Sequence, residues 1–294
     1  LEFSIKKLAK VAPTAAPTGI FEVLMMIATG YLVGGLLGWS QMDRMFLGGM
    51  IAISSTTIII RAFDELNLKT RKFTGLVLGV LIIEDIVAVL LLVLLSTISI
   101  SQNFEGMDMA FSMLRLGFFL ILWFVVGILL IPTLLNKLKD YLDNETILVV
   151  AVGLCLGMVV MANQVGFSSA LGAFLMGTIL AETTIVDKIE HQLKSIKNLF
   201  GAVFFVSVGM MINPTLLWEN ISAVLILTIV VLFGKTIFIT IGMLISGQPL
   251  KASMSSGMSM SQIGEFSFII ATLGLSLGVI SEFLYPIAVG VSVI

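Results

Sequence analysis

The hydrophobic residues of this chain gather in long, nearly unbroken runs that are separated by short polar stretches. An apolar run of about 18 residues or more can cross the hydrocarbon core of a bilayer as a helix. The run at 216–246 is longer than a bilayer requires, which predicts tilt or an extension beyond the headgroups. The sequence predicts nine spans and the start of a tenth near residue 283: about 18–38, 45–63, 73–98, 111–135, 145–162, 166–182, 197–212, 216–246 and 252–279.

The basic residues are distributed unevenly among the connectors between these spans. If the first residues lie in the cytoplasm and the connectors alternate, the outer connectors hold only Arg44, while Arg115 and Lys235 fall inside spans. An excess of Lys and Arg on the cytoplasmic side is the rule for helical membrane proteins, so this orientation is favoured. The cytoplasmic connectors then hold Lys6, Lys7, Lys10, Arg61, Lys69, Arg71, Lys72, Lys137, Lys139, Lys188, Lys194, Lys197 and Lys251.

The composition agrees with a lipid environment. Of the 294 residues, 58% are hydrophobic and 12% are charged, and the mean hydropathy is +1.13. An ordinary soluble domain has about 25% charged residues. The net charge of −2 gives no reason to expect nucleic acid as a partner. Because the runs are solidly apolar and not alternating, they exclude a transmembrane barrel and predict one all-α polytopic membrane module over residues 1–294.

Two adjacent acidic residues, Glu84 and Asp85, lie in the middle of one predicted span. Counted from Phe73, Asp85 lies about 18 Å into its helix, close to the bilayer centre. A carboxylate at this depth is costly unless it is paired, hydrated or protonated. Burial disfavours its charged form, so such an acid is suited to carry a proton. The alternative is a purely structural acid that is hydrogen-bonded between helices.

A single basic residue, Lys235, lies equally deep in another apolar run. Its position is too central for the side chain to reach the membrane surface easily. The sequence suggests that Lys235 pairs with Asp85 when no cation is bound and releases it when a cation arrives.

Two spans are interrupted by polar residues. Four hydroxyl residues, Ser54 to Thr57, interrupt the span at 45–63, and a Ser- and Gly-rich stretch from Ser253 to Glu265 interrupts the span at 252–279. Such residues can satisfy backbone groups where a membrane helix unwinds. Broken helices in corresponding halves of a chain indicate a transport site at the bilayer midplane.

Other classes of function are less compatible with the sequence. A potassium channel would need a filter such as Thr-Val-Gly-Tyr-Gly, which this sequence does not contain. Zinc-protease spacing is also missing, and the single histidine, His191, is expected to be a solvated residue of a basic connector. Neither an enzyme nor a cofactor is therefore expected. An ion-coupled carrier of a small organic solute stays open as an alternative.

Four stretches of the chain form a recognisable set. They are Ser54–Thr57 with Arg61 and Asn67-Leu68; Glu84-Asp85; Ala170–Leu175 through Leu180-Ala181-Glu182, followed by Phe204–Met210; and Ser261–Phe268. In their sequence and spacing they resemble the Kef-type monovalent cation:proton antiporters of the sodium/proton exchanger superfamily. The resemblance extends over essentially the whole chain.

This resemblance implies an inverted-repeat helix bundle in which two broken helices cross, and a homodimer that works by an elevator-like movement. Asp85 resembles the acid that binds the cation and carries the proton, with Glu84 in the same ion- and proton-binding set. Lys235 resembles the lysine that competes with the cation. The polar contacts of the two broken helices would be Ser55, Thr56, Thr57, Gln262 and Glu265.

The chain departs from the family pattern at one position. Many Kef-type potassium efflux proteins have an amide before the acid, where this chain has Glu84. A paired acid together with a membrane lysine is closer to the sodium/proton exchangers, so the resemblance leaves both Na⁺ and K⁺ open as the expected ion. The resemblance also implies a bacterial-type inner membrane, two or three further spans before Leu1, and a cytosolic nucleotide-binding regulatory domain after Ile294.

The expected mechanism is competitive exchange, in which one site holds either protons or a dehydrated cation. Either occupant neutralises the carboxylate of Asp85 and lowers the cost of moving the site across the apolar barrier. The number of protons per cation depends on Lys235. If Lys235 also gives up a proton, two protons move per cation; if it stays charged, the exchange is one for one.

Overall fold

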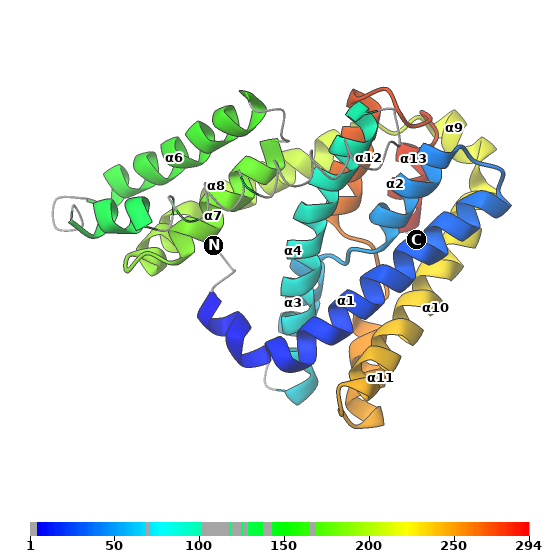
Figure 1. Cartoon of the computed structure of the whole chain (residues 1–294), viewed down its shortest axis with the longest axis horizontal. Coiled ribbons are helices and arrows are strands. Elements are labelled where there is room, and N and C mark those ends of the chain that lie inside the picture. Colours follow the sequence, from blue (N-terminus) through cyan, green and yellow to red (C-terminus); the bar gives the residue numbers. More distant parts are fainter. Residues whose placement is uncertain are drawn as a thin grey trace. The chain divides into compact units, whose positions relative to one another are not determined.

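The computed structural model describes residues 5–68, 71–101, 118, 125, 127, 129–137, 143–164 and 169–293, and all regular elements in this part of the chain are helices (Figure 1). Six helical segments within it are long and apolar enough to cross a membrane, in agreement with an all-α polytopic membrane protein. The helices are α1 (Ile5–Leu36), α2 (Gln41–Ile51), α3 (Thr56–Glu65), α4 (Lys72–Ser101), α6 (Asn144–Gln164), α7 (Ser169–Ala181), α8 (Val186–Met210), α9 (Pro214–Glu219), α10 (Ile221–Ile245), α11 (Leu250–Ser259), α12 (Glu265–Ser276) and α13 (Leu284–Val293).

Most helices coincide with the predicted spans. The two interrupted runs are indeed broken, between Ile51 and Thr56 and between Ser259 and Glu265. The long run at 216–246 contains a boundary at Asn220, where the short helix α9 ends before α10, and this break accounts for its excess length. Most of the span predicted at 111–135, including Arg115, lies outside the described residues.

The span predicted at 197–212 is wrong at its beginning, because α8 starts at Val186. His191 and the neighbouring lysines therefore lie on a helix, although the sequence placed them in a connector; His191 is exposed there. The reason is that this first part of α8 is amphipathic. Ile189 is buried and Leu193, one turn later, packs against the same core, while most of the other positions are charged or polar. Average hydropathy does not detect such a pattern.

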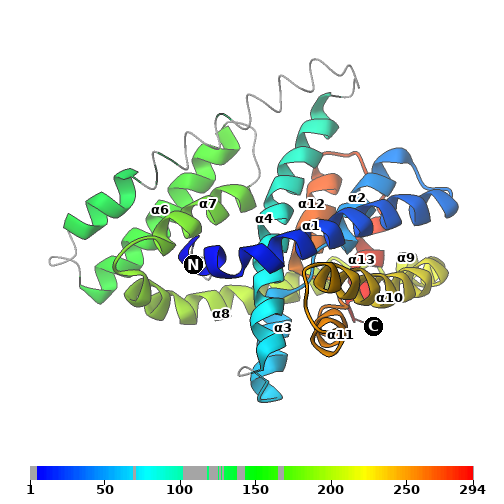
Figure 2. The ribbon, with the colours of Figure 1, turned by 60° about the horizontal axis from the view of Figure 1, so that its bottom comes forward.

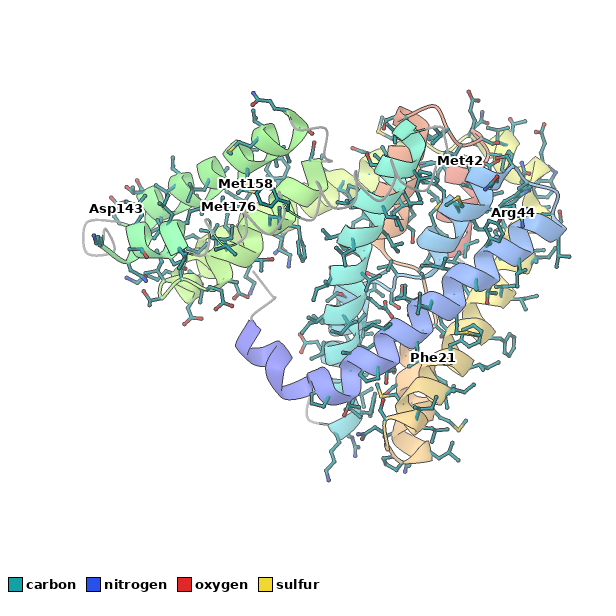
Figure 3. The ribbon with its side chains drawn as sticks, in the orientation of Figure 1. Phe21, Met42, Arg44, Asp143, Met158 and Met176 are labelled. Atoms are coloured by element: carbon teal, nitrogen blue, oxygen red, sulfur yellow. The ribbon has the colours of Figure 1, made fainter. Side chains whose placement is uncertain are left out.

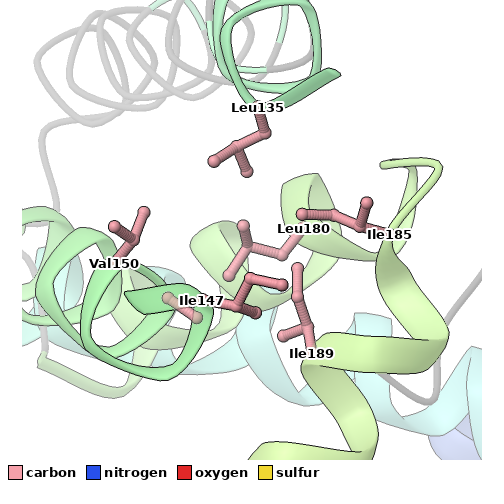
Figure 4. Close-up of a pocket in the computed structure, with 7 residues that line it drawn as sticks. Leu135, Ile147, Val150, Leu180, Ile185 and Ile189 are labelled. Atoms are coloured by element: carbon pink, nitrogen blue, oxygen red, sulfur yellow. The ribbon is translucent and has the colours of Figure 1, made fainter. Parts of the chain in front are cut away.

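The chain forms two compact units, of which one comprises residues 1–7 and 92–207. In this unit α6 and α7 pack closely, with Met158 and Met176 in the shared core (Figure 3). A small pocket in the same unit is lined by aliphatic side chains, including Leu135 and Leu180 (Figure 4). A pocket with only apolar walls offers no ligand to an ion.

Helix α6 begins with a capped first turn. The backbone N–H of Thr146 donates to Oδ1 of Asp143 at 2.7 Å. Hydrogen bonds from the side chain and the backbone of Thr146 hold the pKa of Asp143 below its ordinary value. An ionised carboxylate at this end of a helix is favourable because the helix dipole is positive there.

The second unit, residues 8–91 and 208–294, contains both broken helices. Helix α1 lies against α2 at Gly30 and Gly48, where a Cβ on Gly48 would be 2.7 Å from the carbonyl oxygen of Ile27. On another face of α1, the rings of Phe21 and Phe238 meet edge to face, with 6.5 Å between their centroids. Helices α10 and α11 lie side by side in both views (Figures 1 and 2).

A buried acid, Asp43, joins the start of α2 to the loop between α12 and α13. Only 2% of Asp43 is exposed. Its carboxylate accepts hydrogen bonds from Ser40 Oγ at 2.7 Å, from the backbone N–H of Ser281 at 2.7 Å and from Ser281 Oγ at 2.8 Å. These bonds tie one half of the first broken helix to the segment after the second.

Replacing Asp43 with alanine should therefore destabilise this unit. The substitution leaves three donors without their acceptor, and we expect a loss of about 2–3 kcal/mol in the free energy of unfolding. Unfolding of the purified protein by SDS titration measures this loss. Ser281→Ala is the matched comparison, because it removes only the hydroxyl bond and should cost about 1 kcal/mol. Equal losses in the two variants would contradict this role for Asp43.

Candidate ion-binding site

The breaks of the two interrupted helices cross in direct contact. The backbone N–H of Gly264 donates to the carbonyl oxygen of Ile53 at 2.8 Å, and Ser54 Oγ donates to the carbonyl oxygen of Met260 at 3.2 Å. Just beyond the break, Ser267 Oγ donates to the carbonyl oxygen of Met50. Backbone groups that lose their helical partners at one break are thus satisfied by the other break.

The crossing requires a glycine at position 264. A Cβ on Gly264 would lie 2.6 Å from the carbonyl oxygen of Ser54 and 2.8 Å from the backbone nitrogen of Ser55. Both neighbours are backbone atoms of the other chain segment, so they cannot rotate away as a flexible side chain could.

An acidic side chain lies at the amino end of α3. Ser55 caps this helix by accepting a hydrogen bond from the backbone N–H of Ile58 at 3.2 Å. The carboxylate of Glu265, from the second broken helix, accepts from Ser55 Oγ at 2.6 Å and from Thr57 Oγ1 at 3.1 Å. Gln262 bonds the backbone of Ser55 on both sides, accepting from its N–H at 3.2 Å and donating to its carbonyl at 3.3 Å. A negative charge here is stabilised by the positive end of the helix dipole.

A basic side chain lies at the carboxyl end of α2. Lys235 of α10 is fully buried, and its Nζ donates to the carbonyl oxygen of Ala52 at 3.0 Å and to Ser54 Oγ at 2.8 Å. The same nitrogen is 3.1 Å from Glu22 Oε1 and 3.9 Å from Glu84 Oε2. Lys235 thus compensates the negative end of α2 as Glu265 compensates the positive end of α3.

The two adjacent acids of α4 have different surroundings. Glu84 is fully buried, and its Oε2 accepts a hydrogen bond from the backbone N–H of Ser54 at 2.6 Å. Asp85 is only partly buried, and its Oδ2 accepts from Thr56 Oγ1 at 3.2 Å. Because adjacent helix residues point about 100° apart, Glu84 is directed to the lysine and Asp85 to the first residue of α3.

The predicted site residues therefore lie around one crossing, but one predicted pairing differs. The sequence suggested Asp85 as the partner of Lys235, whereas the contacts of Lys235 in the structure are with Glu22 and Glu84. Glu22 was not predicted as a site residue. Its signal in the sequence is an isolated acid inside the apolar run of α1, between Phe21 and Val23. Which distant helix this acid faces cannot be derived from that run.

No group of three or more His, Cys, Asp or Glu side chains in the described residues could hold a metal ion. A monovalent cation can be held by fewer charged ligands, with hydroxyl and carbonyl oxygens completing the set. Asp85, Thr56 and the backbone carbonyl groups at a helix break are oxygen donors of this kind.

The whole chain, residues 1–294, matches the family model described as sodium/hydrogen exchanger, transmembrane. With two broken helices in contact at a buried set of charges, the fold and the match together show that the chain belongs to the sodium/hydrogen exchanger family of membrane transporters.

The chain is also similar to curated proteins of this group. It is 32% identical to the K⁺/H⁺ antiporter subunit KhtU of Bacillus subtilis, over 98% of the chain and 71% of that protein. It is 30% identical to the putative cation/proton antiporter YbaL of Escherichia coli, over 96% of the chain and 52% of that protein. Identity to the K⁺ efflux antiporter 4 of Arabidopsis thaliana is 28%, over 99% of the chain and 50% of that protein. The resemblance to Kef-type antiporters is confirmed, and the chain spans about half the length of the last two relatives.

Proposed function

We propose that this chain is the membrane transport module of a secondary antiporter that exchanges a monovalent cation, K⁺ or Na⁺, for protons. The observation that carries this proposal is an acid, the partly buried residue Asp85, at a crossing of two broken helices. Membership of the sodium/hydrogen exchanger family supports it. Two of the three relatives above, those of Bacillus subtilis and Arabidopsis thaliana, are named for K⁺, which favours K⁺ as the ion.

In this mechanism Asp85 exchanges one occupant for another. A cation would be held by the carboxylate of Asp85, by Thr56 Oγ1 and by carbonyl oxygens of the break. A proton on the same carboxylate removes its charge and releases the cation. Either occupied form is neutral and can move through a region of low dielectric, whereas the bare carboxylate carries a desolvation penalty. This difference couples the two opposing fluxes and suppresses leak.

The fixed charges Glu265 and Lys235 give the crossing a stable frame for this exchange. Each compensates one helix end, so the breaks persist whether the site is occupied or empty.

We place the module in a bacterial-type inner membrane, with its first residues in the cytoplasm, as a homodimer with inverted repeats. A cytosolic nucleotide-binding domain in the full-length protein is part of the same proposal.

A proteoliposome assay tests the proposed activity. The full-length protein is reconstituted into vesicles that hold a preformed pH gradient and a pH-sensitive dye, and K⁺, Na⁺ and Li⁺ are added in turn. We expect K⁺ or Na⁺ to collapse the gradient in a protein-dependent manner. Failure of every cation to move protons, under gradients of either direction, would refute antiport. Uptake of an organic solute driven by the gradient would then indicate the carrier alternative.

A further inference from the structure

The surroundings of Lys235 indicate its charge state. Three oxygens lie within hydrogen-bond distance of Nζ: Ser54 Oγ at 2.8 Å, the carbonyl oxygen of Ala52 at 3.0 Å and Glu22 Oε1 at 3.1 Å. A charged lysine has three N–H donors and no acceptor, whereas a neutral amine has two donors and a lone pair. Nζ donates hydrogen bonds to Ser54 and Ala52, and its third contact is an ion-pair contact with Glu22. A carboxylate at this distance favours the charged form of the lysine.

The hydroxyl of Ser54 strengthens this conclusion. Its proton is directed to the carbonyl oxygen of Met260 at 3.2 Å, so Ser54 Oγ faces Lys235 as an acceptor. A carbonyl oxygen and an ionised carboxylate also only accept. Neither Ser54 nor Ala52 therefore offers a proton to a neutral amine of Lys235, and an ionised Glu22 offers none.

The charges around Lys235 point the same way. Glu22, Glu84 and Lys235 are each fully buried, so water does not screen them. Glu22 contacts the lysine from α1, and Glu84 lies 3.9 Å from it on α4, while the carboxyl end of α2 adds partial negative charge at Ala52. Two acidic side chains surround one basic group, and this favours the charged lysine.

Asp85 is placed apart from this contact. It follows Glu84 on α4, points about 100° away from it around the helix axis, and accepts from Thr56. Asp85 is also partly exposed, whereas Lys235 and Glu22 are fully buried. A cation that reaches Asp85 therefore has no need to displace the lysine from its partners.

We propose that Glu22 is the fixed counter-ion of Lys235, a positioning residue that keeps this lysine charged throughout the exchange cycle. Only Asp85 then trades a proton for the cation, one proton moves per monovalent cation, and the exchange transports no net charge. This inference rests on the antiport activity proposed above and gives its stoichiometry.

A null-point measurement on the full-length protein in proteoliposomes tests the stoichiometry. A K⁺ gradient, or a Na⁺ gradient if only Na⁺ supports exchange, is set against a pH gradient, with a permeant anion to hold the membrane potential near zero. For one proton per cation, proton flux vanishes when the cation ratio equals the proton ratio. For two protons, it vanishes when the cation ratio equals the square of the proton ratio. The first result is expected, and the second would overturn the inference while leaving antiport intact. If no cation moves protons, the proposed function itself fails.

Substitution of Glu22 tests its part in this arrangement. Glu22→Gln keeps the size of the side chain but removes its charge, so Lys235 should release its proton during the cycle. The cation ratio at which proton flux vanishes is then expected to shift from the proton ratio itself towards the square of the proton ratio. Glu22→Asp keeps the charge and should keep the equal ratio. A Glu22→Gln variant that transports with the equal ratio would show that Glu22 is not what holds Lys235 charged.

A stability comparison keeps the inference testable if Glu22→Gln does not transport. Glu22→Gln, Lys235→Gln and the double variant are compared by their thermal unfolding midpoints in detergent. Each single variant leaves a buried charge without its partner, so the double variant should lose less than the sum of the two single losses. Additive losses would overturn the pairing of Glu22 with Lys235.

Discussion

Asp85→Asn is expected to abolish cation-dependent proton movement. The amide has nearly the shape of the carboxyl group, but it cannot take up a proton and it offers a cation no charge. Losing about 3 kcal/mol of attraction between the carboxylate of Asp85 and the cation corresponds to roughly 100-fold weaker binding of the cation. Because the same group must also carry the proton, exchange should fall to the level of empty vesicles. The dye assay in proteoliposomes, run for each cation, measures this loss.

The matched control is Asp187→Asn, which makes the same chemical change at an exposed position in the first turn of α8. It should transport as the unsubstituted protein does. Size-exclusion chromatography of both variants establishes that they are folded. If Asp85→Asn still collapses the pH gradient at a rate similar to the control, Asp85 is not the exchanging group, and another acid must carry the proton.

Gly264→Ala is expected to disrupt the crossing of the two broken helices. The added methyl group would lie 2.6 Å from the carbonyl oxygen of Ser54, a backbone atom of the other break. The two breaks would have to separate, and the hydrogen bond from Gly264 to Ile53 would lengthen. Overpacking of this kind lowers the free energy of unfolding by about 1–3 kcal/mol. We expect the upper end, because the methyl group would clash with backbone atoms, which cannot rotate away. Transport should decrease as well as stability, because the same crossing positions Thr56 and Asp85.

SDS titration measures the stability of this variant, and the dye assay measures its transport. The control is Gly75→Ala on α4, where a Cβ would meet no atom within 4 Å among the described residues. That substitution should leave stability unchanged or raise it slightly, since alanine is the better helix former. Wild-type stability and transport in Gly264→Ala would mean that the backbones do not approach each other as closely as the structure places them.

Both helix breaks could be predicted from local sequence. Hydroxyl and glycine residues inside otherwise apolar runs identified the interruption before Thr56 and the one before Glu265, and the observed helix ends confirm both. The prediction succeeds because it depends only on which residues can satisfy an unwound backbone at that depth. The beginning of α8 shows the limit of the same approach. Its first turns are polar on average, and their burial depends on one face that packs against neighbouring helices.

The partner of Lys235 could not be predicted in this way. The lysine and Glu22 lie on α10 and α1, and no pattern within either helix indicates that the two meet. The depth of both residues in their spans suggested Asp85 as the partner, and the structure has Glu22 and Glu84 there. The difference matters for mechanism, because a lysine with its own counter-ion is independent of the acid that exchanges the proton.

Sequence alone determined that the chain is an all-α membrane protein, where its broken helices lie, and that Glu84, Asp85 and Lys235 lie too deep in the bilayer to be incidental. These properties follow from the cost of polar groups in lipid, which is set residue by residue along the chain. Only the tertiary structure decided how those charges pair, and which of two adjacent acids is buried against the lysine and which is accessible. Pairing depends on the packing of helices that are distant in the sequence, and a one-dimensional pattern of hydropathy contains no information about that packing.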